Sequence, residues 1–244
     1  MKDINSFWQK LYDQSQQVNL ENMQVEHMQL NHDLALDATI SLSESRWLPS
    51  PAKGVKRLVL DREGGEKTLR ATSIVAYAPN SQFAPHTHPK GEEFFVLAGT
   101  FSDQYGDYPA GTYVRNPPGS SHKPFSRDGC LIWVKLQQFD PNDNQHVVLH
   151  SNQQQAKIND HLCNRRIMFN GYEKVELVEA NQDFVIDPAW IKKGIEILVL
   201  QGQVNSNKLQ FGEGHWLRLA AQNSSVLTVK QNSQLLVKYQ HLEV

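Results

Sequence analysis

The chain has 244 residues, of which 39% are hydrophobic and 20% charged, and its formal net charge at pH 7 is −2. This length admits either one large all-β domain or two domains of about 100–150 residues each, and the composition is that of a globular rather than a disordered chain. The 24 lysine and arginine residues are scattered along the sequence. Since they form no basic stripe, we expect no nucleic-acid partner.

Three further features predict a cytoplasmic protein without a membrane partner. Residues 1–10 contain no apolar run of the signal-peptide kind, and the strongest apolar run, residues 197–200, is far too short to cross a bilayer. Cys130 and Cys163 are the only cysteines. This usage argues against a disulfide scaffold and favours a reducing compartment.

The first segment, residues 1–37, differs from the rest of the chain because its pattern is helical. It contains a glutamine-rich stretch without glycine, which predicts one amphipathic helix over residues 3–17. The apolar face of this helix either caps a barrel end or contacts a second copy in a dimer. Its members are Phe7, Trp8, Leu11 and Tyr12.

From residue 38 onward the pattern is one of short strands and turns. Residues 62–66 predict a hairpin turn, residues 140–144 end the first half, and residues 152–155 resemble a linker. Runs of β-branched and aromatic residues bounded by Gly, Pro, Asn and Asp are typical of a sandwich or barrel of short strands. Such runs occupy residues 72–77, 94–97, 111–114 and 131–134.

The second half of the chain repeats the first at a single offset of 103 residues, which aligns Gly91 with Gly194. An internal repeat sustained without a gap over some fifty positions predicts two similar β-domains in tandem. We place the first over residues 38–145 and the second over residues 146–244. The offset also pairs Glu93 with Glu196, Val96 with Val199, Leu97 with Leu200, Gly99 with Gly202, Gly111 with Gly214, Arg115 with Arg218, and Val134 and Lys135 with Val237 and Lys238.

The first repeat holds residues that suit a metal ion. His86 and His88 are two positions apart, so on a strand both side chains point to the same face and can enter a barrel interior. Glu92 follows after a short turn, and His122 comes from another strand after a proline-glycine bend. Imidazole suits Zn, Fe, Ni or Cu, and the carboxylate favours the harder ions. We expect one divalent metal and leave its identity open at this point.

The repeat also separates ligands from structural residues. Glu93 survives as Glu196 in the second copy, which indicates a structural role, and Glu92 is therefore the preferred carboxylate ligand. Glu93 stays open as the alternative. We expect the second barrel to bind no metal and to have an apolar centre. In that copy the offset replaces the four candidate ligands by Ala189, Ile191, Ile195 and Ser225.

Residues 86–99 and 111–122 resemble the two cupin motifs, His-x-His-x3-Glu-x6-Gly and Gly-x5-Pro-x-Gly-x2-His, and the chain is similar to a bicupin. The resemblance implies tandem double-stranded β-helix (jelly-roll) barrels with a short N-terminal helix, an all-β fold. It also implies zinc held by His86, His88, Glu92 and His122. More narrowly, four stretches are similar to the cupin domain of ChrR-type anti-sigma factors: residues 47–55, 60–66, 70–75 and 107–113.

The same resemblance has one departure. Those anti-sigma factors carry a separate helical domain with its own zinc site, His-x3-Cys-x2-Cys, which binds the sigma factor. No cysteine precedes Cys130 in this chain. This difference argues against direct sigma-factor binding.

Two functions remain. The first is a ChrR-like metal-binding bicupin that acts as a sensor or binding module for a small molecule or a reactive oxygen species. The alternative is a non-haem metal-dependent dioxygenase that cleaves carbon–carbon bonds in small ketones or diketones, as similar single cupins do. Whether the chain is an enzyme stays open, and no catalytic residue is assigned beyond the metal ligands. We expect a small-molecule ligand and a homodimer.

Overall fold

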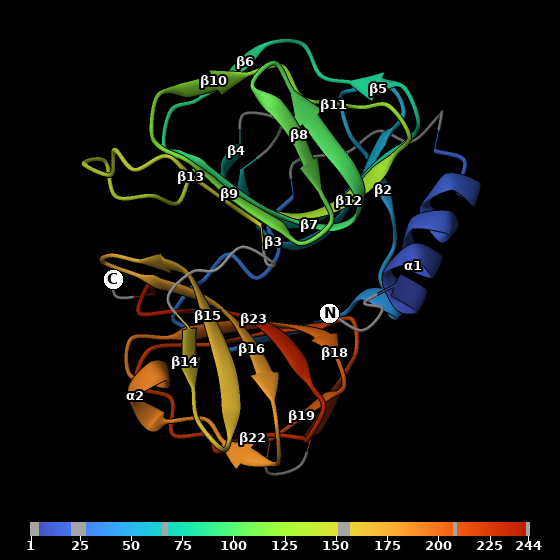
Figure 1. Cartoon of the computed structure of the whole chain (residues 1–244). Coiled ribbons are helices and arrows are strands. Elements are labelled where there is room, and N and C mark those ends of the chain that lie inside the picture. Colours follow the sequence, from blue (N-terminus) through green and yellow to red (C-terminus); the bar gives the residue numbers. More distant parts are fainter. Residues whose placement is uncertain (1–4, 21–27, 65–67, 151–156, 207–208, 243–244) are drawn as a thin grey trace. The chain divides into compact units, whose positions relative to one another are not determined.

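The structure, a computed structural model, describes residues 5–20, 28–64, 68–150, 157–206 and 209–242. Its contacts divide the chain into two units, residues 1–32 with 45–152 and residues 33–44 with 153–244. Figure 1 shows that each unit is built mainly of strands. The predicted all-β fold with one short N-terminal helix is confirmed. The linker predicted at residues 152–155 lies outside the described residues.

The first unit is a barrel of antiparallel strands preceded by a helix. Its main sheet has the order β13-β9-β7-β12-β4-β3-β2, and β6 and β10 form a separate pair. The elements are α1 (Asn5–Gln17), β2 (Leu48–Pro49), β3 (Val55–Gly64), β4 (Thr68–Tyr77), β5 (Ser81–Gln82), β6 (His86–His88), β7 (Glu92–Asp103), β8 (Gly106–Pro109), β9 (Thr112–Asn116), β10 (Ser120–His122), β11 (Phe125–Ser126), β12 (Cys130–Leu136) and β13 (Val147–His150).

Helix α1 packs on the first barrel against β7 and β12. Trp8 and Leu11 on its inner side are 0% and 3% exposed, as the apolar periodicity predicts. Inside the barrel an apolar cluster includes Phe94, Val96 and Ile132. Their strand neighbours Phe95 and Trp133 point to the opposite face of the sheet and are buried as well, so both faces of the sheet are covered here.

The second unit has the same kind of architecture. Its larger sheet has the order β1-β21-β18-β23-β16-β15-β14, and its smaller sheet the order β17-β22-β19-β20. The elements are β1 (Ala38–Ser41), the 3₁₀ turn η1 (Leu42–Glu44), β14 (Lys157–Asn159), β15 (Cys163–Asn170), β16 (Lys174–Ala180), β17 (Phe184–Val185), α2 (Pro188–Ile191), β18 (Ile195–Gln201), β19 (Gln203–Ser206), β20 (Leu209–Gly212), β21 (His215–Leu219), β22 (Leu227–Val229) and β23 (Gln234–Tyr239).

The boundaries of the two structural units differ from the domain boundaries expected from the sequence, residues 38–145 and 146–244. Strand β1 precedes the first barrel in the chain, yet Ala38–Ser41 pair antiparallel with β21 of the second unit. Strand β13 follows residue 145, yet it pairs with β9 of the first unit. The first unit therefore includes β13 up to His150, and residues 38–44 belong with the second unit rather than with the first barrel.

The backbone repeats at the same offset as the sequence. Left-handed positions recur 103 residues apart in six pairs, and in three of these pairs the second copy has no glycine. Gly99 shows why the conformation is fixed: its φ is +70°, and a Cβ there would lie 2.2 Å from the carbonyl oxygen of Gly129. The pairs are Gly91 and Gly194, Gly99 and Gly202, Gly111 and Gly214, Gly119 and Gln222, Gly129 and Asn232, and Gln137 and Gln240.

A buried charged group recurs as well. In the first barrel Glu93 lies between Arg115 of β9 and Lys135 of β12 as cross-strand neighbours, and all three are fully buried. The carboxylate accepts a hydrogen bond from the Tyr113 hydroxyl at 2.6 Å and lies 3.7 Å from Nη1 of Arg115. Arg115 also contacts Asp143. Glu93 is thus part of the frame between strands.

The second barrel retains this arrangement residue by residue. Glu196 lies between Arg218 of β21 and Lys238 of β23, and all three are buried. Trp216, which replaces Tyr113, has its indole Nε1 3.4 Å from the Glu196 carboxylate. The retained charges therefore belong to the common scaffold of the two barrels.

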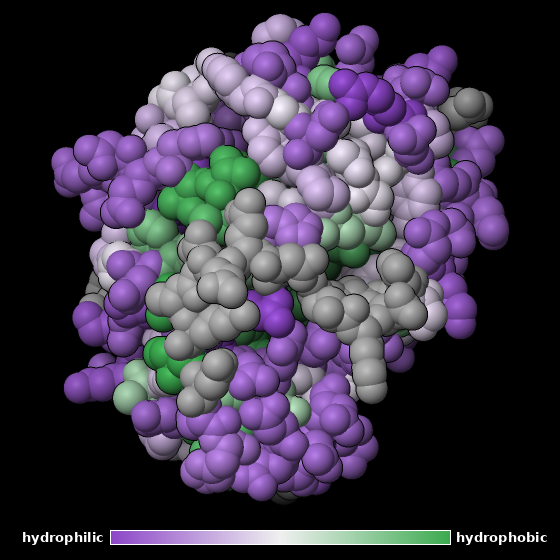
Figure 2. Space-filling model, viewed as in Figure 1, coloured by the Kyte–Doolittle hydropathy of each residue, from purple (hydrophilic) through white to green (hydrophobic). Residues whose placement is uncertain are grey.

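The surface agrees with the composition. Figure 2 shows a largely hydrophilic face in which apolar side chains gather in limited areas. Large exposed apolar residues come from separate stretches of the chain, such as Leu36, Leu69 and Tyr172. Among the described residues, no helix has the length and apolar character needed to cross a membrane.

Candidate metal centre

Three imidazoles converge in the first barrel. His86 and His88 come from β6, and His122 comes from β10, where it pairs directly opposite His86. One ring nitrogen from each of the three lies within 4.8 Å of the others. His88 and His122 are buried, whereas His86 is partly exposed. The short antiparallel β6–β10 pair thus brings together histidines that are 34 positions apart.

Glu92 borders this cluster from the first residue of β7. Its Oε2 lies 3.6 Å from Nε2 of His88 and 3.4 Å from Nε2 of His122. Asn116, its cross-strand partner on β9, donates a side-chain hydrogen bond to the same oxygen at 3.1 Å. Neighbouring residues on a strand point to opposite faces. Glu92 therefore faces the imidazoles, while Glu93 faces the charged frame on the other side of the sheet.

The tight turn before β7 needs a glycine. Gly91 has a φ of +77°, and a Cβ added there would meet the ring of Phe139 at 2.3 Å. A residue with a side chain at this position would displace the ring or the start of β7. The turn fixes where Glu92 enters the barrel, which explains in physical terms why a glycine precedes it.

Two of the histidines are oriented by hydrogen bonds on the far side of their rings. Nδ1 of His86 lies 2.9 Å from the carbonyl oxygen of Ala84, and Nδ1 of His122 lies 3.2 Å from Oδ2 of Asp103. Asp103 is held in turn by the Tyr108 hydroxyl at 3.1 Å and by the backbone N–H of Tyr105 at 2.8 Å. With Nδ1 occupied as a donor, Nε2 is left as the lone-pair atom that can bind a metal.

The electrostatics keep the cluster suited to a cation. Burial lowers the pKa of His88, which favours the neutral imidazole that a metal requires. Burial raises the pKa of Glu92, but His88, His122 and the Asn116 hydrogen bond outweigh it, and the pKa is lowered overall. For His122, burial lowers the pKa, but Glu92 and Asp103 outweigh burial and raise it overall. Because its pKa is lowered, the Glu92 carboxylate is ionised at neutral pH.

The donor set fits one divalent ion. Two ligands that each bind at about 2.1 Å are at most about 4.2 Å apart. Nε2 of His88 and Nε2 of His122 are 3.0 Å apart, and the two distances to Glu92, 3.4 and 3.6 Å, are also below that limit. The widest separation in the histidine group, up to 4.8 Å, needs only a small movement. Three nitrogens and one oxygen suit Zn, Fe, Mn or Ni.

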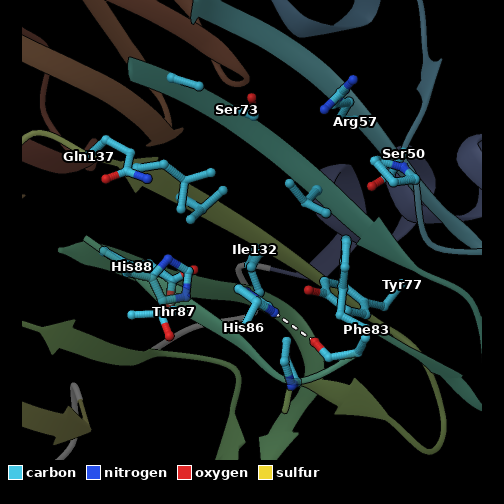
Figure 3. Close-up of a pocket in the computed structure, with 18 of the residues that line it drawn as sticks. Ser50, Arg57, Ser73, Tyr77, Phe83, His86, Thr87, His88, Ile132 and Gln137 are labelled. Carbon is cyan, nitrogen blue, oxygen red and sulfur yellow. Dashed lines mark hydrogen bonds and ion pairs between the residues drawn. The ribbon is translucent and has the colours of Figure 1, made fainter. Parts of the chain in front are cut away.

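His86, His88 and Glu92 line a cavity of about 620 Å³ inside the first barrel. Figure 3 shows His86 and His88 on one wall, with Arg57, Ser73 and Ser50 across the cavity. Apolar side chains of β4 and β12, including Val75 and Ile132, line the space between. A molecule of moderate size can therefore approach the candidate metal position from inside the barrel.

The second barrel has lost this site. The equivalents of His88 and Glu92 are Ile191 and Ile195, which are 2% and 0% exposed and belong to a large apolar cluster. The predicted apolar centre is confirmed. Among the described residues, the only group of three or more possible metal ligands is the histidine cluster of the first unit.

Comparison with known families identifies the first barrel. Residues 36–140 match the family of ChrR cupin-like domains. The first barrel is therefore similar to these cupin-like domains. The family match spans both sequence motifs and all four candidate ligands, which agrees with the resemblance read from the motifs. No functionally curated protein matches the chain significantly.

Solved structures share the fold over most of the chain. Protein Ylba from E. coli is 13% identical, with a TM-score of 0.66 over 90% of this chain and 94% of that chain. The bacterial pirin YhhW from Escherichia coli, in complex with nickel(II), is 14% identical, with a TM-score of 0.59 over 84% and 98%. A putative dioxygenase from Nostoc punctiforme is 14% identical, with a TM-score of 0.59 over 88% and 81%. At these identities the similarity concerns the fold.

Proposed function

We propose that the first cupin barrel binds one divalent metal through His86, His88, His122 and Glu92, and that this centre recognises a small molecule held in the adjoining cavity. The observation that carries the proposal is the convergence of three imidazoles and one ionised carboxylate, of which His86, His88 and Glu92 line a cavity of about 620 Å³. One-sided coordination leaves positions on the ion open toward the cavity.

As the primary function we propose a ChrR-like sensor or binding module in the cytoplasm, with zinc as the metal. The match of residues 36–140 to the ChrR cupin-like family supports this choice, and the nickel complex of the pirin supports the capacity of the fold to hold a divalent ion. Iron, manganese and nickel are the alternatives. We further propose a homodimer, for which edge strands such as β14 offer unpaired backbone groups.

A metal-dependent dioxygenase acting on small ketones or diketones is the second candidate. It is favoured by the size of the cavity beside the histidines and by the fold shared with the putative dioxygenase. A redox-active metal bound there would supply the chemistry with dioxygen. The chain would contribute the orientation of the ketone against apolar walls and the exclusion of water, and no protein nucleophile is required.

Metal analysis of protein purified without chelator tests the proposal. We expect about one transition metal per chain, a content far below one in His122→Ala, and an unchanged content in His215→Ala, whose histidine lies on β21 of the second unit. Full retention of the metal in His122→Ala would refute the ligand set. Slowly exchanging zinc supports the binding module, whereas iron with oxygen uptake on a β-diketone panel supports the dioxygenase.

A further inference from the structure

Two arginines line the same cavity as the histidines. Arg57 and Arg62 both lie on β3 and are 9% and 3% exposed. They are five positions apart, and in a regular strand such residues point to opposite faces. A β-bulge between Val59 and Asp61 shifts the register, so that both arginines face the cavity and Asp61 lies on the opposite face of the sheet.

The pairing of the strands places one arginine in line with a candidate metal ligand. Arg62 of β3 pairs with Ala71 of β4, Ala71 with Leu136 of β12, and Leu136 with Glu92 of β7. Three strand spacings separate the backbones of Arg62 and Glu92 by about 14 Å. One of the two intervening side chains is the small Ala71. The row therefore leaves room for a ligand of a few carbon atoms between guanidinium and metal.

The charges of the wall favour an anion. Among the described residues, Arg57, Arg62 and Glu92 are the lining residues with arginine or carboxylate side chains, and Glu92 faces the imidazoles rather than the arginines. Asp61, the acidic residue beside Arg62, lies on the opposite side of β3, 3.9 Å from Nε of Arg70. A bound divalent cation would increase the positive charge of the cavity further.

The shape and polarity of the wall favour a carboxylic acid over an inorganic anion. Between the arginines and the histidines the lining is apolar, with Val75, Ile132 and Val134 contributed by β4 and β12. A carbon chain gains by contact with these side chains, whereas an inorganic ion does not. The planar guanidinium group matches a carboxylate through two parallel hydrogen bonds.

We propose that the cavity binds small organic acids, with the carboxylate on Arg57 and Arg62 and the opposite polar end toward the metal. The inference deepens the proposed function and rests on it for the metal end only. The carboxylate end depends on the arginines alone, so it can be tested with the metal present or removed.

Isothermal titration calorimetry on the full chain tests the proposal with 4-oxopentanoate, a keto acid whose two polar ends are separated by two methylene groups. We expect the zinc-loaded protein to bind it at least tenfold more tightly than 4-oxopentanamide, the neutral analogue, and more tightly than inorganic phosphate. Equal affinity for acid and amide would overturn the proposal without recourse to any variant. Tighter binding of phosphate would also overturn it, since the site would then be an inorganic anion site.

Variants locate the carboxylate. Arg62→Met and Arg57→Met should each weaken binding of 4-oxopentanoate by about tenfold to a hundredfold, the usual effect of losing a charged hydrogen-bond partner. Arg127→Met removes the same charge from an exposed side chain paired with Asp107, outside the cavity, and should leave the affinity within about twofold. Arg62→Lys keeps the charge and should bind with intermediate affinity, which separates lost recognition from misfolding.

Failure of the inference and failure of the proposed function give different results. Metal content reports the function, and the acid-to-amide ratio reports the inference. If the wild type holds one metal per chain but the arginine variants bind 4-oxopentanoate as tightly as the wild type, the arginine subsite is refuted and the metal centre stands. If the wild type holds no metal but still prefers the acid through the arginines, the metal centre is refuted and the arginine subsite stands.

Discussion

Exchanging the two adjacent glutamates separates the proposed metal centre from the charged frame of the barrel. Glu93 is 0% exposed, accepts the Tyr113 hydrogen bond at 2.6 Å and lies 3.7 Å from Arg115. Removing one partner of a buried ion pair costs about 3–5 kcal/mol. Because Asp143 still contacts Arg115, we expect Glu93→Gln to lower the free energy of unfolding by about 3 kcal/mol, at the low end of that range, without loss of metal.

Glu92→Gln should have the opposite effects: a lower metal content and little change in the free energy of unfolding. Asn116 can still donate its hydrogen bond to the new amide oxygen, so we expect the metal-free variant to unfold within about 1 kcal/mol of the wild type. The lost carboxylate removes a ligand oxygen 3.4 Å from Nε2 of His122, and the metal content should fall. Urea unfolding of the chelated proteins and elemental analysis of the untreated ones measure both effects. Release of the metal by Glu93→Gln, with retention by Glu92→Gln, would refute the assignment.

Four other predictions concern the two barrels. Gly99→Ala should lower the free energy of unfolding, measured in urea, by more than about 2 kcal/mol, because the new Cβ would lie 2.2 Å from a carbonyl oxygen at a φ of +70°. Gly106→Ala is the control: there is open space around this position, and the free energy of unfolding should change by less than about 0.5 kcal/mol. Burial raises the pKa of Cys130 to about 12, so about one thiol in ten thousand is ionised at pH 8. Iodoacetamide should therefore label Cys130 only after the protein unfolds. Labelling of the folded protein as fast as that of a free thiol would contradict the burial. Because that thiol is neutral in the fold, its contribution to stability should decline as pH rises above its ordinary value of 9.0. The second barrel should hold no transition metal, and a second ion per chain that survives His122→Ala would show otherwise.

The repeat made the fold and the candidate ligands predictable from sequence. The glycines at the 103-residue offset occupy left-handed positions that few other residues adopt, so their spacing records the path of the backbone. The same offset distinguished Glu92 from Glu93, and the structure places the first toward the imidazoles and the second toward Arg115. Whether Glu92 is a metal ligand stays a prediction until the metal is measured.

Other features left no readable signal in the sequence. Asp103 orients His122 from 19 positions away, and nothing in its local pattern marks it as a partner of that ring. Ala38–Ser41 lie where the predicted strand-and-turn pattern begins, but only tertiary pairing decides that they join β21. Arg57 and Arg62 have the odd spacing of opposite faces, and the bulge that brings both inward is not visible in the residue pattern.

The two barrels share a scaffold but differ in the residues that fill their interiors. In the second, Ile191 and Ile195 fill the interior, so burial of apolar surface stabilises it without any ligand. In the first, the equivalent positions carry His88 and Glu92, both buried, and burying imidazole and carboxylate groups is costly unless they are paired or coordinated. A metal ion bound there would therefore add directly to the folding free energy of the first barrel. On this reasoning, chelation should lower the thermal stability of the first barrel and leave that of the second unchanged.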